Sequence, residues 1–225
     1  MNAGNEYYLL LFDIKNSTKL KASLAREKFD RLENAIIELN STYSEEMSLK
    51  MSINYGDEIA GLFYTPKSFY LIADKFREIM YPETSLRFVA IKGKIAVISN
   101  DIRQIGGTIF KQANTEMVRL KKENIFSWWG IDKKPTDHAL TALSELSNAV
   151  INDMSSYQRE VYQLLKLGLN QKEIAKKLDK YAQSVWDAIQ RSKATNVLLA
   201  EEAISRLLSE INNENKLIKE KESEK

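Results

Sequence analysis

The stretch YYLLLFD, residues 7–13, decides the fold, because six consecutive apolar residues followed by an acid indicate a buried strand that ends on a carboxylate. At the edge of a core, Asp13 must be hydrated, paired or bound to a metal. A second acid, Asp57, stands in Gly56-Asp57-Glu58 within MSINYGDEIAGLF, residues 51–63. Mg²⁺ is usually held by one or two protein carboxylates plus substrate phosphates, so Asp13 and Asp57 together predict a nucleotide site.

Each acid also fits an ordinary structural role. Asn16, Ser17 and Thr18 follow Asp13 and are residues that begin helices, so Asp13 suits a turn before a helix. The dipeptide Gly56-Asp57 is favoured at the tip of a hairpin. The evidence for a nucleotide site therefore comes from the two acids taken together.

The composition is that of a globular protein with two domains. The 225 residues are 44% hydrophobic and 28% charged, with three prolines and a net charge of +2. The chain has no cysteine, which excludes disulfides and cysteine zinc sites and agrees with a reducing compartment. The longest apolar run near the start is too short to span a membrane, so we expect a cytoplasmic protein with no membrane partner.

The first 135 residues predict an α+β domain of the palm-like, ferredoxin type, with one sheet covered by helices. The expected elements in order are a strand at 7–13, a helix at 18–43, a hairpin at 49–64, a helix at 68–80, a strand, bend and strand at 86–98, a helix from Gly106-Gly107 to about Lys122, and a strand at 125–131. Asp57 and Glu58 would lie at the tip of the hairpin.

The remainder predicts an all-α part that begins after Lys133-Lys134-Pro135. Residues 136–154 read as a connecting helix capped near Thr136 or Asp137, and residues 212–225 as a frayed or disordered charged tail. Residues 155–211 carry short amphipathic helices around Gly168, including 171–178 and 182–193, followed by a longer one.

The N-terminal motifs resemble the cyclase homology domain of class III nucleotidyl cyclases over residues 7–130. The matching segments are FDIKNSTKL at 12–20, YGDEIAGLF at 55–63, and LRFVAIKGKIAV at 86–97 followed by Gly106-Gly107-Thr108. The resemblance implies that Asp13 and Asp57 hold Mg²⁺. It also implies that the backbone of Ile14, Lys15, Asn16 and Ser17 contacts phosphate.

The departures from that family concern its catalytic partners. Phe110 and Asn114 stand where the cyclases have an asparagine and an arginine, and Ile53 stands where they have a purine-selecting lysine. Because an arginine fork makes bidentate contacts that asparagine cannot, we expect cyclase activity to be lost. Lys111 is the candidate for a remaining phosphate contact.

Residues 155–193 resemble the helix-turn-helix of LuxR-type regulators and of the promoter-binding region of sigma factors. Ala175 allows a close helix crossing, and the exposed face of 182–193 would meet the major groove. Residues 155–195 hold eight lysines and arginines against four acids, a local net charge of +4. The predicted DNA-binding residues are Lys172, Lys180, Gln183, Ser184, Asp187, Gln190, Arg191 and Lys193. The alternative is a three-helix packing or dimerisation module.

Over nearly its full length the chain resembles the SatD family, through Asp13–Ser17, Gly56–Leu62 and QKEIAKKL at 171–178. The combined expectation is a DNA-binding regulator whose degenerate cyclase-like palm senses a nucleotide, forms a homodimer, or both. The alternatives are an active metal-dependent nucleotidyltransferase or phosphohydrolase using Asp13 and Asp57, and a scaffold that binds neither DNA nor nucleotide.

Overall fold

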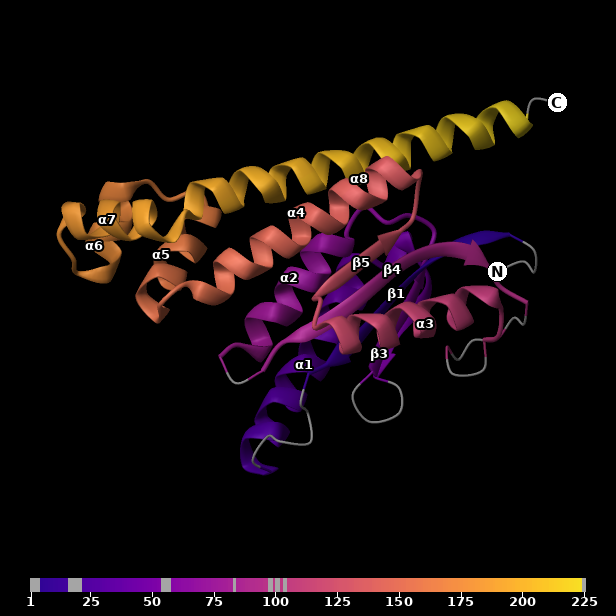
Figure 1. The fold of residues 1–225 in the computed structure, drawn as a ribbon, viewed down its shortest axis with the longest axis horizontal. Coiled ribbons are helices and arrows are strands. Elements are labelled where there is room, and N and C mark those ends of the chain that lie inside the picture. Colours follow the sequence, from indigo (N-terminus) through magenta and orange to yellow (C-terminus); the bar gives the residue numbers. More distant parts are fainter. Residues whose placement is uncertain are drawn as a thin grey trace. The chain divides into compact units, whose positions relative to one another are not determined.

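A computed structural model describes residues 5–15, 22–53, 58–82, 84–96, 99, 102 and 105–223. The fold is α+β, with a five-stranded mixed sheet followed by a helical C-terminal region (Figure 1). The chain forms two compact units, which we call the sheet unit, Met1–Thr141 with Leu207–Lys225, and the helical unit, Ala142–Arg206. The boundaries between the units fall inside two helices.

The sheet has the strand order β2-β3-β1-β4-β5, which puts β1 at its centre. The strands are β1 (Glu6–Ile14), β2 (Met47–Ile53), β3 (Glu58–Phe63), β4 (Leu86–Lys94) and β5 (Ser127–Gly130). β1 pairs antiparallel with both β3 and β4, whereas β5 runs parallel to β4. The predicted strands at 7–13 and 125–131 are confirmed.

Both faces of β1 are buried, and different helices cover them (Figure 1). On one face, Tyr7, Leu9 and Leu11 belong to a core that includes residues of α3 (Thr108–Glu123). On the other face, the rings of Tyr8 and Phe12 pack edge-on against Phe69 and Phe76 of α2 (Phe69–Met80), with centroids 6.4 and 5.0 Å apart. β1 therefore lies between two helical layers.

Helix α1 (Ala22–Thr42) lies on the same face as α2. The buried Lys28 ammonium of α1 donates to the carbonyls of Ile79 and Tyr81 at the end of α2, both at 2.9 Å. A cation at this position satisfies carbonyls that have no partner within the helix and offsets the negative end of the helix dipole.

The predicted second strand after the bend at Lys92-Gly93-Lys94 is wrong for the described residues, because β4 runs unbroken through Lys94 and Ile95 and Ala96 extend no strand. Gly93 has a packing role instead: a Cβ there would lie 3.2 Å from the Cβ of Ile109 in α3. The glycine thus allows close contact between strand and helix.

Helix α4 (Lys134–Asp153) begins before the predicted cap, and Pro135 lies in its first turn, where proline is tolerated. Asp137 is therefore inside the helix, and its Oδ1 accepts the N–H groups of Ile131 and Asp132, both at 3.0 Å. Burial raises the pKa of Asp137, against the lowering effect of these two hydrogen bonds.

Helix α8 (Ala194–Ser223) continues through most of the charged tail predicted at 212–225. No proline or glycine interrupts residues 194–223, so nothing local ends the helix. Among the described residues, no helix combines the length and the apolar character needed to cross a membrane.

The edge strand β2 follows a short 3₁₀ turn, η2 (Ser44–Glu46), and its pairing with β3 is irregular on both sides of Leu49. Asn40 of α1 adds two hydrogen bonds to the backbone of β2. Its amide accepts from the N–H of Met51 and donates to the Met51 carbonyl, both at 2.8 Å. The Asn40 amide therefore makes the two hydrogen bonds that the backbone of a neighbouring strand would make at this edge of the sheet.

We predict that Asn40→Ala lowers the free energy of unfolding by about 1–3 kcal/mol, because it leaves two backbone groups of the buried Met51 without a partner. Urea unfolding followed by circular dichroism measures the change. Asn34→Ala, at an exposed position of the same helix, is the matched control. Equal destabilisation by both variants would contradict this role of Asn40.

Candidate functional site

The carboxylate of Asp13 lies between two protein cations at the end of β1. Its side chain is buried, and in the sheet Asp13 pairs with Glu58 of β3 and Arg87 of β4. The Nζ of Lys121, from the last turns of α3, lies 2.6 Å from Asp13 Oδ1, and Nη1 of Arg87 lies 3.8 Å from Oδ2. Each carboxylate oxygen therefore has a positive neighbour.

Two further residues complete a group that we call the β1-end cluster: Asp13, Lys15, Arg87, Lys121 and Asn124. The Nζ of Lys15 donates to Asn124 Oδ1 at 2.7 Å, and Nη2 of Arg87 lies 3.5 Å from the same oxygen. Asn124 ends α3 in the left-handed conformation, with φ of 55°. Asparagine tolerates this conformation better than most residues.

The backbone groups at the end of β1 are largely engaged in hydrogen bonds within the fold. Ile14 belongs to β1 and pairs with Leu86 of β4, so its main chain is part of the sheet. The N–H of Lys15 donates to the Ser85 carbonyl at 2.8 Å, and the Thr84 hydroxyl donates to the Lys15 carbonyl. Among the predicted phosphate-binding residues of the first motif, Lys15 offers its side chain, whereas Asn16 and Ser17 lie outside the described residues.

The surroundings of Asp13 do not fit Mg²⁺ as they stand. A divalent cation on this carboxylate would lie beside Lys121 and Arg87, and like charges at such distances repel strongly in a buried setting. Within the described ranges, no three His, Cys, Asp or Glu side chains gather as a metal site would require. Gly56 and Asp57, the other half of the predicted metal site, lie outside those ranges.

Lys111, the other predicted phosphate contact, does not join the β1-end cluster. It precedes Lys121 by ten residues on α3, about 15 Å along a helix axis. Lys111 instead lines a separate hollow of about 460 Å³ between α3 and strands β4 and β5. Asn114, on the same helix, is exposed, and Phe110 packs against the core on the α3 face of the sheet.

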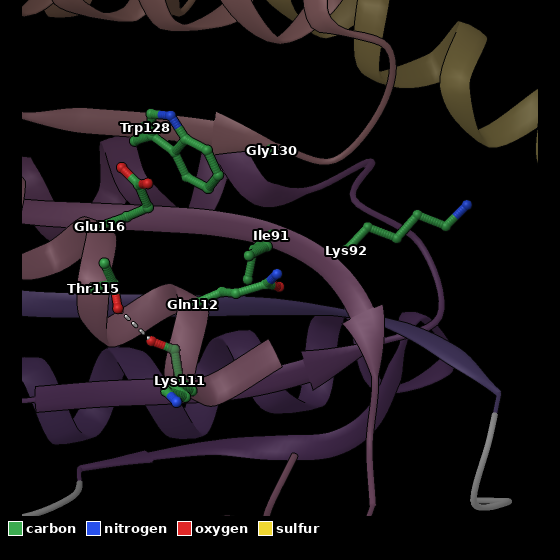
Figure 2. Close-up of a pocket in the computed structure, with 8 residues that line it drawn as sticks. All are labelled: Ile91, Lys92, Lys111, Gln112, Thr115, Glu116, Trp128 and Gly130. Carbon is green, nitrogen blue, oxygen red and sulfur yellow. Dashed lines mark hydrogen bonds between the residues drawn. The ribbon is translucent and has the colours of Figure 1, made fainter. Parts of the chain in front are cut away.

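Figure 2 shows the residues that line this hollow, of which Lys111, Gln112, Thr115 and Glu116 come from α3, and Trp128 and Gly130 from β5. The indole of Trp128 lies over Gly130, where a Cβ would be only 2.2 Å from the ring. The Thr115 hydroxyl donates to the Lys111 carbonyl at 2.9 Å, and Glu116 is paired with Arg119 at 2.8 Å. The side chain of Lys92 extends away from the other lining residues.

In the helical unit, three short helices follow the predicted boundaries closely. They are α5 (Ser156–Lys166), α6 (Gln171–Leu178) and α7 (Ala182–Ser192). α5 and α6 both begin with capping boxes, Ser155 with Gln158 and Asn170 with Glu173, in which each side chain bonds the other's backbone N–H. Asp179 ends α6 in the left-handed conformation, which allows a tight turn into α7.

A common core holds these helices together. Its buried members are Val161, Leu164, Ile174, Ala175, Val185 and Ala188. α5 is also tied to α8 within the helical unit, because the Tyr162 hydroxyl donates to Glu201 Oε1 at 2.7 Å and Lys166 Nζ lies 3.2 Å from Oε2. The shared core fixes the orientation of α7 relative to α5 and α6.

The predicted DNA-binding residues lie mainly on the outside of this three-helix core. Lys172, Lys180, Gln183, Gln190, Arg191 and Lys193 are exposed, and Ser184 and Asp187 are half-buried. Trp186 is 46% exposed and lies on the same side of α7 as Gln183 and Gln190, by their spacing of three and four residues. Nε2 of Gln183 is 3.3 Å from Asp187 Oδ1. The outer face of α7 is therefore open, and it combines polar side chains with the indole of Trp186.

Sequence reasoning missed Arg87, Lys121 and Asn124. One signal was available for Arg87, since it interrupts the apolar run LRFVAI, residues 86–91, at a position that the strand buries. Lys121 and Asn124 gave no comparable signal. A lysine in the last turn of a helix and an asparagine after it are ordinary helix endings.

Comparison of the sequence with protein-family models and with curated proteins finds no match.

We predict that Asp13→Ala lowers the free energy of unfolding by about 1–3 kcal/mol, because it removes the carboxylate that accepts from Lys121 and neighbours the buried Arg87. Chemical denaturation measures the change. Asp30→Ala, at an exposed position of α1, should stay within about 0.5 kcal/mol of the parent protein. A tolerated Asp13→Ala would show that the ion pairs at the end of β1 contribute little.

Proposed function

We propose that the chain is a cytoplasmic DNA-binding regulator, in which α7 contacts the major groove and the sheet unit binds a phosphate-bearing ligand such as a nucleotide. The observation that carries the proposal is the outer face of α7. Its inner side packs in a complete three-helix core, and its outer side presents Gln183, Trp186 and Gln190 to solvent.

The dimensions of α7 suit a recognition helix. Eleven residues make a rod about 16 Å long, and the major groove of B-DNA, about 12 Å wide, admits one α-helix. The helix follows α6 through a tight turn at Asp179, as the second helix of a helix-turn-helix does. The outward face of α7 carries amide and guanidinium groups, which are the groups that bind base edges in the major groove.

The proposed DNA contacts fall into two groups, those to base edges and those to phosphates. Gln183, Ser184, Gln190 and Arg191 would contact base edges, because amides and guanidinium groups match the donors and acceptors of the major groove. Lys172, Lys180 and Lys193 are exposed on the flanks and would contact phosphates. Asp187 opposes nonspecific affinity through its charge, and its Oδ1 accepts a hydrogen bond from the Gln183 amide at 3.3 Å.

For the sheet unit, we propose a degenerate relative of the cyclase palm, as in the SatD family. The strand order β2-β3-β1-β4, with helices between β1 and β2 and between β3 and β4, supports a ferredoxin-like palm extended by α3 and β5. A homodimer formed through this unit is part of the proposal, on the basis of the same resemblance. An active metal-dependent enzyme is less well supported, because Lys121 and Arg87 already pair with Asp13.

We predict that the double variant Gln190→Ala/Arg191→Ala binds a selected duplex at least about tenfold more weakly, because each base contact contributes about 1–3 kcal/mol. Fluorescence anisotropy at fixed salt, with a duplex enriched from a random library, measures the affinity. Thr195→Ala, at an exposed position of α8, should bind as the parent protein does. If no duplex is enriched, or if the double variant binds normally, α7 is not a recognition helix.

A further inference from the structure

The guanidinium group of Arg87 lacks a strong acceptor. Arg87 is 9% exposed, and within the described residues its polar side-chain contacts are Asp13 at 3.8 Å and Asn124 at 3.5 Å. Both contacts are long, although the group has five N–H donors in a rigid fork. In the described part of the chain, no nitrogen of Arg87 is both buried and without a partner, so the donors that these two contacts leave over reach solvent and are open to a ligand.

The other members of the β1-end cluster point to the same missing acceptor. Lys15 and Arg87 both approach one neutral atom, Oδ1 of Asn124, at 2.7 and 3.5 Å. The positive charges of Lys15 and Arg87 repel each other, and an anion bound between them would offset this repulsion. Asp13 does not supply it, because its closest cation is Lys121.

The local charge favours an anion. Lys15, Arg87 and Lys121 against Asp13 leave a net charge of +2 in the cluster. Glu58 pairs with Asp13 from β3 and lowers the local charge to +1. β3 and β4 lie on opposite sides of β1, so Glu58 and Arg87 flank Asp13 from opposite neighbouring strands.

We infer that the end of β1 carries a metal-independent site for the phosphate group of a small ligand, formed by Lys15, Arg87, Lys121 and Asn124. Arginine offers a fork that matches phosphate oxygens, and the two lysines add point charges. The Asn124 amide can donate through Nδ2. Lys15 is half-buried, whereas Lys121 and Asn124 are exposed, so the site has an open side.

This site deepens the ligand-binding half of the proposed function, on which it rests, and it needs no DNA binding by α7. It differs from the predicted cyclase site in its chemistry. In the predicted cyclase site, carboxylates bind a metal cation, and that cation binds the phosphates. At the end of β1, Asp13 is already paired with protein cations, and lysine and arginine side chains would bind the phosphate directly. Phosphate binding should therefore not need a divalent metal.

The test is calorimetric titration of the full chain with inorganic phosphate and, separately, with ATP, both in excess EDTA. We expect binding of at least one probe in EDTA. Binding of inorganic phosphate shows that the phosphate group alone is sufficient, and binding of ATP alone shows that the phosphate is recognised as part of a larger ligand.

Lys15→Met should weaken that binding about tenfold or more, since it removes a charged donor. Lys15 does not contact Asp13, so its loss leaves the buried ion pairs in place. The matched control is Lys122→Met, an exposed lysine next to Lys121 that lies outside the cluster, which should bind as the parent protein does. Thermal unfolding checks that both variants fold.

Three results would overturn the inference: no binding of either probe in EDTA, equal binding by the parent protein and Lys15→Met, or binding that requires Mg²⁺ and is lost in Asp13→Asn. DNA binding is measured on the same preparations. If phosphate binding is absent while DNA binding persists, this inference fails and recognition by α7 stands. If DNA binding is absent while phosphate binding persists, the DNA-binding proposal fails instead.

Discussion

Strand β1 is buried on both faces, and this constraint organises the sheet unit. Six apolar residues in a row leave no face of the strand for water, so helices must cover the sheet on both sides. The first charged side chain beyond that run, Asp13, is then buried as well and must be paired. Lys121 and Arg87 provide the pairing, and in doing so they bring the end of α3 and the start of β4 to the end of β1.

The same constraint explains what the sequence could predict of this region. That Asp13 must be hydrated, paired or bound to a metal follows from the apolar run before it. The kind of partner does not follow, because Lys121 is more than a hundred residues away and reaches Asp13 only when α3 packs on the sheet. The resemblance to a cyclase suggested a metal, and the described residues place two protein cations there. The cyclase-like motif points to Lys111 as a phosphate contact, but along α3 Lys111 lies about 15 Å from Lys121.

The helical unit was predicted more closely because its signals are local. Ser155 and Asn170 cap the helices that follow them, Gly168 permits a positive φ of 85°, and Ala175 lies in the shared core. Each of these features acts within a few residues along the chain. The polar composition after Asn212 favours disorder, whereas the absence of proline and glycine up to Ser223 allows α8 to continue.

A regulator that senses a phosphate ligand must bind DNA with a different affinity when that ligand is present, because only a difference in affinity between two states can shift their populations. The most direct measurement is the affinity for a selected duplex, at constant ionic strength, with and without saturating inorganic phosphate or ATP, whichever binds more tightly. We expect a change of at least about fivefold in the parent protein and little change in Lys15→Met. An unchanged DNA affinity at full ligand saturation would contradict the account.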